Sequence, residues 1–152
     1  MQPFPYIPGL LGFREVPLLV ELYQKLTLKP DLLFVDGHGI CHPRKLGIAS
    51  HLGIVLDIPT IGVAKSILVG EIEKPLGDDI GSLSPLIWKG ETIGMAVRTK
   101  RRCSPLIISA GHKVTLDYAV ELVLSCLKGY KLPEPTRQSH LAAGICRKTD
   151  HV

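Results

Sequence analysis

Short apolar runs alternate with helix-spaced apolar positions along the middle of the chain. Residues 32–35 form an unbroken apolar run that stops at Asp36, which is typical of a strand buried on both faces. Apolar residues then recur with helical spacing over 46–56, before a second short run at 60–63. The order strand, helix, strand predicts a parallel pair of strands joined by a right-handed crossover.

The next part of the chain predicts more strands and then a helix. Residues 85–98 carry a turn signal at 89–91 and therefore predict an antiparallel hairpin, and 105–110 predict a further strand. Thr115 is suited to cap the N-terminus of a helix, and Gly129 is suited to end that helix. Together with the parallel pair, these elements predict a mixed sheet with helices.

The two ends of the chain differ from its middle. Residues 3–9 contain three prolines, which exclude a helix or a central strand and predict a stiff, exposed loop. A helix should follow, with Pro17 in its first turn and Lys29-Pro30 after its end. We expect one α/β domain over residues 1–132, followed by a polar C-terminal tail at 133–152.

Composition narrows the class of protein only slightly. The chain has 152 residues, 45% of them hydrophobic, and a formal net charge of +4, which fits one folded domain and permits a polyanionic partner without requiring one. The clearest basic feature is the run of Arg98, Lys100, Arg101 and Arg102. It predicts either a solvated turn or a patch that contacts phosphates.

Cysteine spacing and hydropathy bear on the compartment. The four cysteines lie far apart and form no CxxC pair, so nothing indicates a disulfide framework. No apolar run approaches the roughly 20 residues of a membrane span. We therefore expect a cytoplasmic, monomeric protein that has no membrane partner.

Polar residues follow several of the predicted strands. Ligands of open α/β sheets bind beyond the carboxyl ends of the strands, and Asp36, Lys65 and His112 each come at or just after such an end. Glu15 lies at the start of the first helix, near a chain reversal. Converging carboxylates favour a hard cation such as Mg²⁺, which prefers oxygen ligands. The alternative for Asp36 is a side chain that caps the following turn.

Three further interpretations of these residues stay open. His38, Cys41 and His42 suggest a zinc site, although no second pair of ligands with zinc-site spacing follows. Cys41 could instead act as a nucleophile, or His38 could simply be a hydrogen-bonded turn residue. Lys65 precedes Ser66 without the glycines of a phosphate loop, so it is either a lone ammonium at the mouth of a site or a solvated strand-end lysine.

A series of short motifs resembles the endonuclease V family. Any one of them would be weak evidence, but together they occur in the family's order from Pro5 to about Arg137 and are highly specific. The motifs are Pro5-Tyr6-Ile7-Pro8-Gly9, Phe13-Arg14-Glu15, Val35-Asp36-Gly37-His38-Gly39, His42-Pro43-Arg44, Gly62-Val63-Ala64-Lys65, Gly111-His112 and Leu132-Pro133-Glu134-Pro135-Thr136-Arg137.

The resemblance implies a fold and an activity. Members of this family have a ribonuclease H-like fold, a mixed sheet flanked by helices, and use Mg²⁺, for which Mn²⁺ can substitute. They hydrolyse the second phosphodiester bond on the 3′ side of deoxyinosine in DNA, leaving 3′-hydroxyl and 5′-phosphate ends. Some members act on inosine in single-stranded RNA. The resemblance therefore implies a deoxyribonuclease V of DNA repair.

The family's catalytic roles carry over to four residues of this sequence. The resemblance implies that Glu15 and Asp36 bind the metal ion, that His112 lies near the attacking water or the metal, and that Lys65 contacts the scissile region. Asp36→Ala should then abolish cutting while leaving binding largely intact.

Recognition of the damaged base is implied for a second set of residues. Tyr6, held in the proline-rich loop, looks like the family's wedge at the point where the base leaves the stack, and flanking prolines reduce the entropy lost in presenting such a tip. The residues that resemble the hypoxanthine pocket are Gly9, Leu11, Gly37, His42 and Ile48.

The sequence departs from the family at its start. The family begins with a strand that carries another catalytic Asp, followed by two more strands, all upstream of the proline-rich loop with which this chain begins. The chain should therefore lack the N-terminal antiparallel strands of the fold and leave a sheet edge open. We expect the polypeptide alone to be poorly active and marginally folded.

Two rival functions follow from the same residues. The chain could be a non-catalytic fragment that binds inosine-containing nucleic acid, in which case it would shift such DNA without cutting it. It could also be an unrelated metallohydrolase of small phosphoesters that uses Asp36 and the histidines. The tyrosine framed by prolines argues against the small-substrate enzyme, which has little use for a rigid exposed aromatic side chain.

Overall fold

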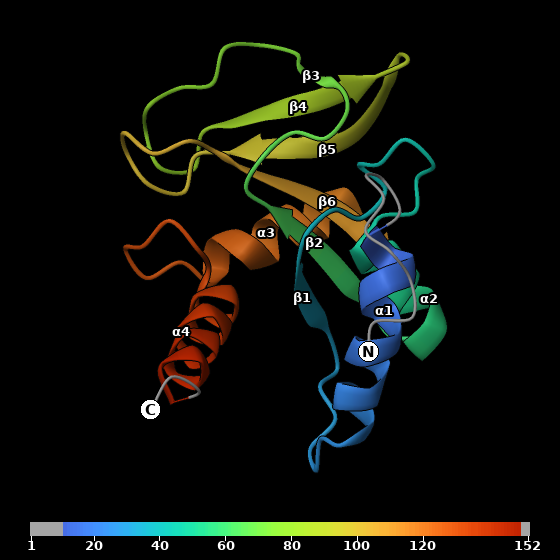
Figure 1. The fold of residues 1–152 in the computed structure, drawn as a ribbon. Coiled ribbons are helices and arrows are strands. Elements are labelled where there is room, and N and C mark those ends of the chain that lie inside the picture. Colours follow the sequence, from blue (N-terminus) through green and yellow to red (C-terminus); the bar gives the residue numbers. More distant parts are fainter. Residues whose placement is uncertain (1–10, 150–152) are drawn as a thin grey trace.

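A computed structural model describes residues 11–149 of the chain. Tyr6 and Gly9 lie outside this part, and of Leu11 only the backbone is described. Within it, four helices surround one six-stranded sheet (Figure 1). The helices are α1 (Leu11–Gln24), α2 (Ile48–Leu56), α3 (Leu116–Ser125) and α4 (Glu134–Thr149), and the strands are β1 (Leu33–Asp36), β2 (Thr60–Ala64), β3 (Glu71–Ile72), β4 (Leu83–Trp88), β5 (Glu91–Val97) and β6 (Leu106–His112).

The sheet is mixed, as the sequence predicts. Its strands follow the order β1-β2-β6-β5-β4-β3; β1 and β2 are parallel, and every other neighbouring pair is antiparallel. The predicted hairpin is confirmed, with its turn at Lys89-Gly90 between β4 and β5. β1 is an edge strand of the described sheet, so one side of its backbone has no strand partner there.

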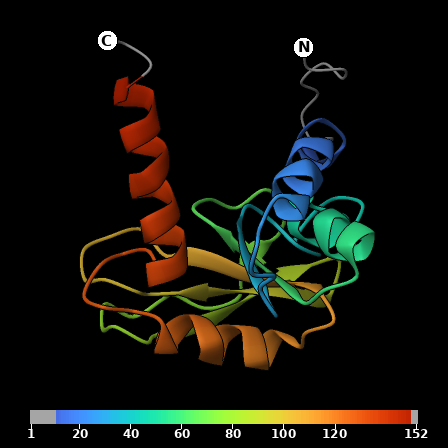
Figure 2. The same ribbon diagram turned by 90° about the horizontal axis from the view of Figure 1, so that it is seen from below.

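Helices cover both faces of the sheet. Figure 2 shows α3 lying along one face, while α1, α2 and α4 are on the other side. Ala119 and Val123 of α3 pack with Ile61, Val63 and Ile108, all fully buried. Burying a side chain of this size contributes roughly 1.5–3 kcal/mol, so this layer is a principal source of stability.

A second cluster joins α1 and α2 to β1. Val16 of α1, Leu52 of α2 and Val35 of β1 are buried against one another. Thr60 of β2 also donates a hydrogen bond from its buried hydroxyl to the carbonyl oxygen of Ala49, 2.6 Å away. These contacts fix the end of β1, where Asp36 lies, relative to both helices.

Two helix ends lie where the sequence predicts them, the start of α3 and the end of α2. Thr115 is the N-cap of α3, as predicted, and its hydroxyl accepts a hydrogen bond from the Tyr118 N–H. α2 ends at Leu56, and its C-cap, Asp57, adopts the left-handed conformation with φ 54°. That backbone lets the Asp57 N–H bond back to the carbonyl oxygen of Gly53.

Three expectations about the helices need correction. Pro17 lies inside α1 and not in its first turn, because the helix already includes Leu11. α3 ends at Ser125, before Gly129, which instead supplies a positive φ in the following loop. The segment 133–152, expected only as a polar tail, contains the helix α4 over most of its length. No helix among the described residues is long and apolar enough to cross a membrane.

Candidate active site

Asp36 is the last residue of β1 and lies at the edge of the sheet. It pairs in register with Val63 of β2, and the following Gly37 N–H donates to the Val63 carbonyl oxygen at 3.2 Å. This bond satisfies the backbone where the strand ends, while about half of the Asp36 side chain stays exposed to solvent. Its carboxylate is therefore both fixed in position and accessible to a ligand.

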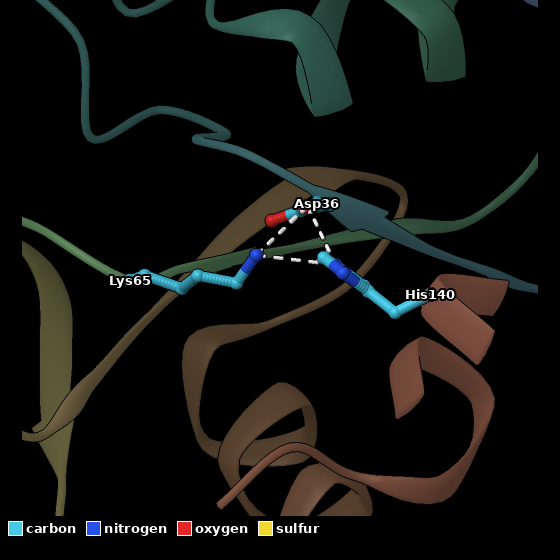
Figure 3. A network of polar contacts seen from close by, with 3 residues as sticks. All are labelled: Asp36, Lys65 and His140. Atoms are coloured by element: carbon cyan, nitrogen blue, oxygen red, sulfur yellow. Dashed lines mark hydrogen bonds and ion pairs between the residues drawn. The ribbon is translucent and has the colours of Figure 1, made fainter. Parts of the chain in front are cut away.

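Two cationic or ionisable side chains meet this carboxylate (Figure 3). Lys65, the residue after β2, brings Nζ to 3.3 Å from Asp36 Oδ2, and His140 of α4 brings Nε2 to 2.9 Å from the same oxygen. The Lys65 and His140 nitrogens are 3.1 Å apart. One carboxylate oxygen, one ammonium and one imidazole nitrogen thus form a triangle.

A single protonation state cannot satisfy all three contacts of this triangle. His140 Nε2 carries either a proton, which it can donate to Asp36, or a lone pair, which can accept from Lys65, but not both. In either state one side of the triangle is unsatisfied, and if the imidazole is charged it also repels the ammonium. The site consequently has hydrogen-bonding capacity left for a further group.

Glu15 reaches the same region from α1. Glu15 and Asp36 both line a cavity of about 470 Å³, whose other walls are mainly apolar side chains of α1, β1 and α2. Glu15 Oε1 also lies 3.8 Å from Nε of the neighbouring Arg14. The two carboxylates that the sequence singled out therefore open onto one cavity.

A second, smaller cavity lies against α4. It has a volume of about 230 Å³ and is lined by Asp36, His140, Phe34, Thr136, Ser139 and Ala143. The Thr136 hydroxyl is buried and makes no hydrogen bond within the described part of the chain. Thr136 and Asp36 therefore line the same small cavity at this end of the sheet.

The fit to a divalent metal ion is partial. Asp36 and Glu15 offer carboxylates and His140 offers an imidazole, which are donors that Mg²⁺ or Mn²⁺ accepts. However, no group of three or more His, Cys, Asp or Glu side chains in residues 11–149 is arranged to hold a metal ion. Asp36, Glu15 and His140 are therefore candidate ligands whose side chains would have to draw closer around an ion.

The loop after Asp36 and the first residue of α2 carry three of the residues implied for a base pocket. The Ile48 side chain packs directly against Gly37, where an added Cβ would come within 2.5 Å of it. Gly37 also has φ 155°, which residues with a side chain rarely adopt. His42 is buried, and its Nδ1 accepts a hydrogen bond from the Arg44 N–H at 3.1 Å.

His112 does not join the site, and its expected position there is wrong. β6 runs antiparallel to β2, so its last residue, His112, pairs with Thr60 at the beginning of β2, whereas Asp36 pairs with Val63 near the end. His112 Nε2 instead lies 3.2 Å from Asp57 Oδ1. Hydrogen bonds from Lys113 and then His112 lower the pKa of the Asp57 carboxyl.

The alternatives based on His38 and Cys41 lose support. Cys41 is fully buried, and this burial raises the pKa of its thiol to about 11, which disfavours the thiolate that a nucleophile or a zinc ligand needs. His38 Nε2 lies 2.8 Å from the Ser66 carbonyl oxygen. The interpretation of His38 as a hydrogen-bonded turn residue is therefore confirmed.

His140 is the site residue that the sequence argument missed. It was overlooked because residues 133–152 were expected to form a polar tail. A signal was present, since Glu134 and Pro135 are both favoured in the first turn of a helix. Recognising that helix would still not have shown that it packs beside β1.

Comparison with known proteins identifies the family. The family model for endonuclease V matches residues 1–141. Endonuclease V of Protochlamydia amoebophila is 60% identical over 147 residues, which are 97% of this chain and 63% of that protein. Endonuclease V of Gloeobacter violaceus is 58% identical over 145 residues, 95% of this chain and 59% of that protein. The chain thus spans about three fifths of these two relatives.

Solved structures agree with this result. Endonuclease V from Streptomyces avermitilis is 38% identical with a TM-score of 0.90, covering 99% of this chain and 66% of that one. The catalytic domain of human Endonuclease V is 39% identical with a TM-score of 0.88, covering 97% of this chain and 67% of that one. Ciona intestinalis Endonuclease V, solved with a DNA that contains an inosine, is 28% identical with a TM-score of 0.79 and coverages of 97% and 69%. The mixed α/β fold matches these structures, and the chain belongs to the endonuclease V family.

Proposed function

We propose that this chain acts in the hydrolysis of inosine-containing nucleic acid, at the second phosphodiester bond on the 3′ side of the inosine. The observation that carries the proposal is the meeting of Asp36, Lys65 and His140 at the carboxyl end of β1. Family membership and the inosine-containing DNA bound by the Ciona relative support the choice of substrate. DNA with deoxyinosine is the proposed substrate, and inosine in RNA a second one.

The charges of the site suit an attack on a phosphodiester. Hydrolysis joins a water oxygen to phosphorus and breaks the bond from phosphorus to the 3′ oxygen, so the water loses a proton and the leaving oxygen gains one. The Lys65 ammonium can stabilise negative charge on the phosphate or on the leaving oxygen. The His140 imidazole, beside the Asp36 carboxylate, can hold the proton that the water loses.

A metal ion is the expected cofactor of this reaction. Asp36 and Glu15 are the side chains that would hold Mg²⁺ or Mn²⁺, which leaves the His140 imidazole free to take the proton. When bound, the ion supplies positive charge that offsets the charge developing on the phosphate. The Lys65–Asp36 ion pair is more than a third exposed on both sides, so it is weak enough to be exchanged for such contacts.

Base recognition is proposed for the loop after Asp36 and for the N-terminal loop. Gly37, His42 and Ile48 lie close to Asp36 in sequence, and the Ile48 side chain packs directly against Gly37, where there is no room for a side chain. Gly9 and Leu11 would complete the pocket. Tyr6 would occupy the gap that the flipped base leaves in the stack. A mispaired base costs less free energy to flip out than a paired one, which favours the damaged base.

The test compares one substitution inside the site with the same substitution outside it. The full chain is incubated with Mg²⁺ and a single-stranded oligonucleotide that contains one deoxyinosine, and the products are separated on a denaturing gel. Asp36→Asn should lower the cleavage rate about a hundredfold or more while binding persists. Asp31→Asn, an exposed position before β1, should cut like the wild type. Equal rates for the two variants would overturn the assignment of Asp36.

A second candidate function is binding without cutting. It is favoured by the lack of an assembled three-ligand metal site among residues 11–149. A wild-type chain that shifts inosine-containing DNA on a native gel, prefers it to the same DNA with adenine, and yields no cleaved product with Mg²⁺ or Mn²⁺ would establish this function. Cleavage by the wild type would exclude it.

A further inference from the structure

Two neighbouring loops carry exposed cations at the end of the sheet where Asp36 lies. One is the turn between β5 and β6, residues 98–105, and the other is the loop between α3 and α4, residues 126–133. Both project from the left side of Figure 1, beside the start of α4. We call these two segments together the basic end. They include the arginine-rich run for which the sequence left a solvated turn and a phosphate patch as alternatives.

Hydrogen bonds tie the two loops to each other. The buried Thr99 hydroxyl donates to the Lys131 carbonyl oxygen, and Lys131 Nζ donates to Ser104 Oγ at 2.7 Å. The Arg98 guanidinium donates hydrogen bonds to two backbone carbonyl oxygens, that of Gly77 at 3.0 Å and that of Cys103. The turn is therefore preorganised, which lowers the entropy lost when it binds a ligand.

The cations that remain point to solvent. Lys100 and Arg102 are exposed, and no carboxylate pairs with either among the described residues. Arg101 is also exposed but forms an ion pair with Asp79 at 2.7 Å. Arg102 adopts φ 59°, a left-handed conformation that is uncommon for residues with a side chain and that often marks a functional turn.

The strand registers place these cations within reach of the scissile site. Asp36 is level with Val63 of β2, and Ala64 pairs with Ile107, next to the start of β6. The turn joins β6 to β5 just beyond the pair Val97 and Leu106. Asp36 is separated from the turn by two strand spacings across the sheet and by a few residues along the strand. The distance between them is therefore about 15 Å. A nucleic acid strand at Asp36 would reach the turn within a few nucleotides.

We propose that Lys100 and Arg102 bind the sugar-phosphate backbone of the nucleic acid strand whose scissile bond lies at Asp36. This proposal rests on the proposed function for its ligand and adds a second point of attachment outside the catalytic residues. Fixed, unpaired cations on a preorganised turn suit repeated phosphates, which supply affinity independently of base sequence. The contacts hold the strand in register while base recognition occurs elsewhere.

The experiment measures how binding depends on salt. A fluorescently labelled single-stranded oligonucleotide with one deoxyinosine is titrated with the full chain in EDTA, and log Kobs is plotted against log salt concentration. The plot has a negative slope, and the double variant Lys100→Gln/Arg102→Gln should make that slope less steep by about 1.4, since each phosphate contact with a single strand contributes about 0.7 to its magnitude. Thermal unfolding of each protein checks that the fold is retained.

A charge-matched control separates local contacts from net charge. Lys89→Gln/Lys113→Gln removes two exposed lysines, at φ 51° and 54°, from the opposite end of the sheet. We expect its slope to stay within about 0.3 of the wild type. Equal slope changes in the two double variants, or no change in the first, would overturn the proposal.

The result also distinguishes this proposal from the proposed function. If the wild type prefers inosine and the two double variants behave alike, only the role of the basic end fails. If the wild type shows no preference for inosine over adenine but Lys100→Gln/Arg102→Gln still makes the salt dependence less steep, the backbone contact stands and the proposed function fails.

Discussion

The packing of Gly39 against β6 gives the sharpest test of how Asp36 is held in place. The loop after Asp36 crosses β6 so closely that a Cβ at Gly39 would lie 2.0 Å from the Ala110 carbonyl oxygen and 3.0 Å from Gly111 Cα. Both are backbone atoms, so neither can rotate away. In Gly39→Ala the loop and the strand must therefore separate by more than an ångström.

The cost can be worked out from the contacts that this separation breaks. The Ile40 N–H donates to the Ala110 carbonyl oxygen and the Gly39 N–H donates to Ser109 Oγ, each at 2.9 Å. Losing both costs about 2 kcal/mol, and overpacking costs about 1–3 kcal/mol more. We expect Gly39→Ala to lower the free energy of unfolding by about 4 kcal/mol and the Tm by roughly 12 °C.

The measurement is urea and thermal unfolding, with Gly144→Ala as the matched control. Gly144 lies inside α4, and a Cβ there meets no atom within 4 Å, so this substitution should stabilise the protein by up to about 1 kcal/mol. A Gly39→Ala variant whose Tm stays within about 2 °C of the wild type would refute the close crossing of loop and strand. Cleavage, where the wild type cuts, should fall further than the folded fraction, because the loop begins at Asp36.

Three further predictions address the rest of the fold. Thr115→Ala should cost about 1 kcal/mol in urea unfolding by removing the cap of α3, and Thr115→Ser should restore it; equal stability of the two variants would contradict the cap. Burial lowers the pKa of His51, so the unfolded state takes up the proton at a higher pH than the folded state, and the free energy of unfolding falls as the pH drops below 6.5. The free energy of unfolding of His51→Gln should fall less over the same pH range. Parallel plots of the free energy of unfolding against pH for the wild type and the variant would contradict this. Cys41, with a pKa of about 11, should resist a thiol reagent at about pH 8 until urea exposes it, whereas Cys103 and Cys126 react in the native state; rapid native labelling of Cys41, located by mass spectrometry, would contradict its burial.

The sequence by itself determined most of the elements and the family, but neither α4 nor β3. The apolar run before Asp36 and the turn at Lys89-Gly90 are local patterns, and local patterns report which backbone conformation buries apolar side chains. The ordered motifs were specific enough to indicate endonuclease V, and the family comparison confirms it. Asp36 and Lys65 were correctly expected at one edge of the sheet, because β1 and β2 are parallel and joined by a helix.

Only the tertiary structure decided which other side chains reach that edge. His112 also follows an apolar strand, but β6 runs antiparallel to β2 and carries it to the opposite end. His140 comes from a polar segment 104 residues after Asp36, yet α4 brings it to 2.9 Å from that carboxylate. Strand direction and helix docking depend on contacts between residues far apart in the chain, and neither leaves a mark in the local pattern of apolar and polar positions.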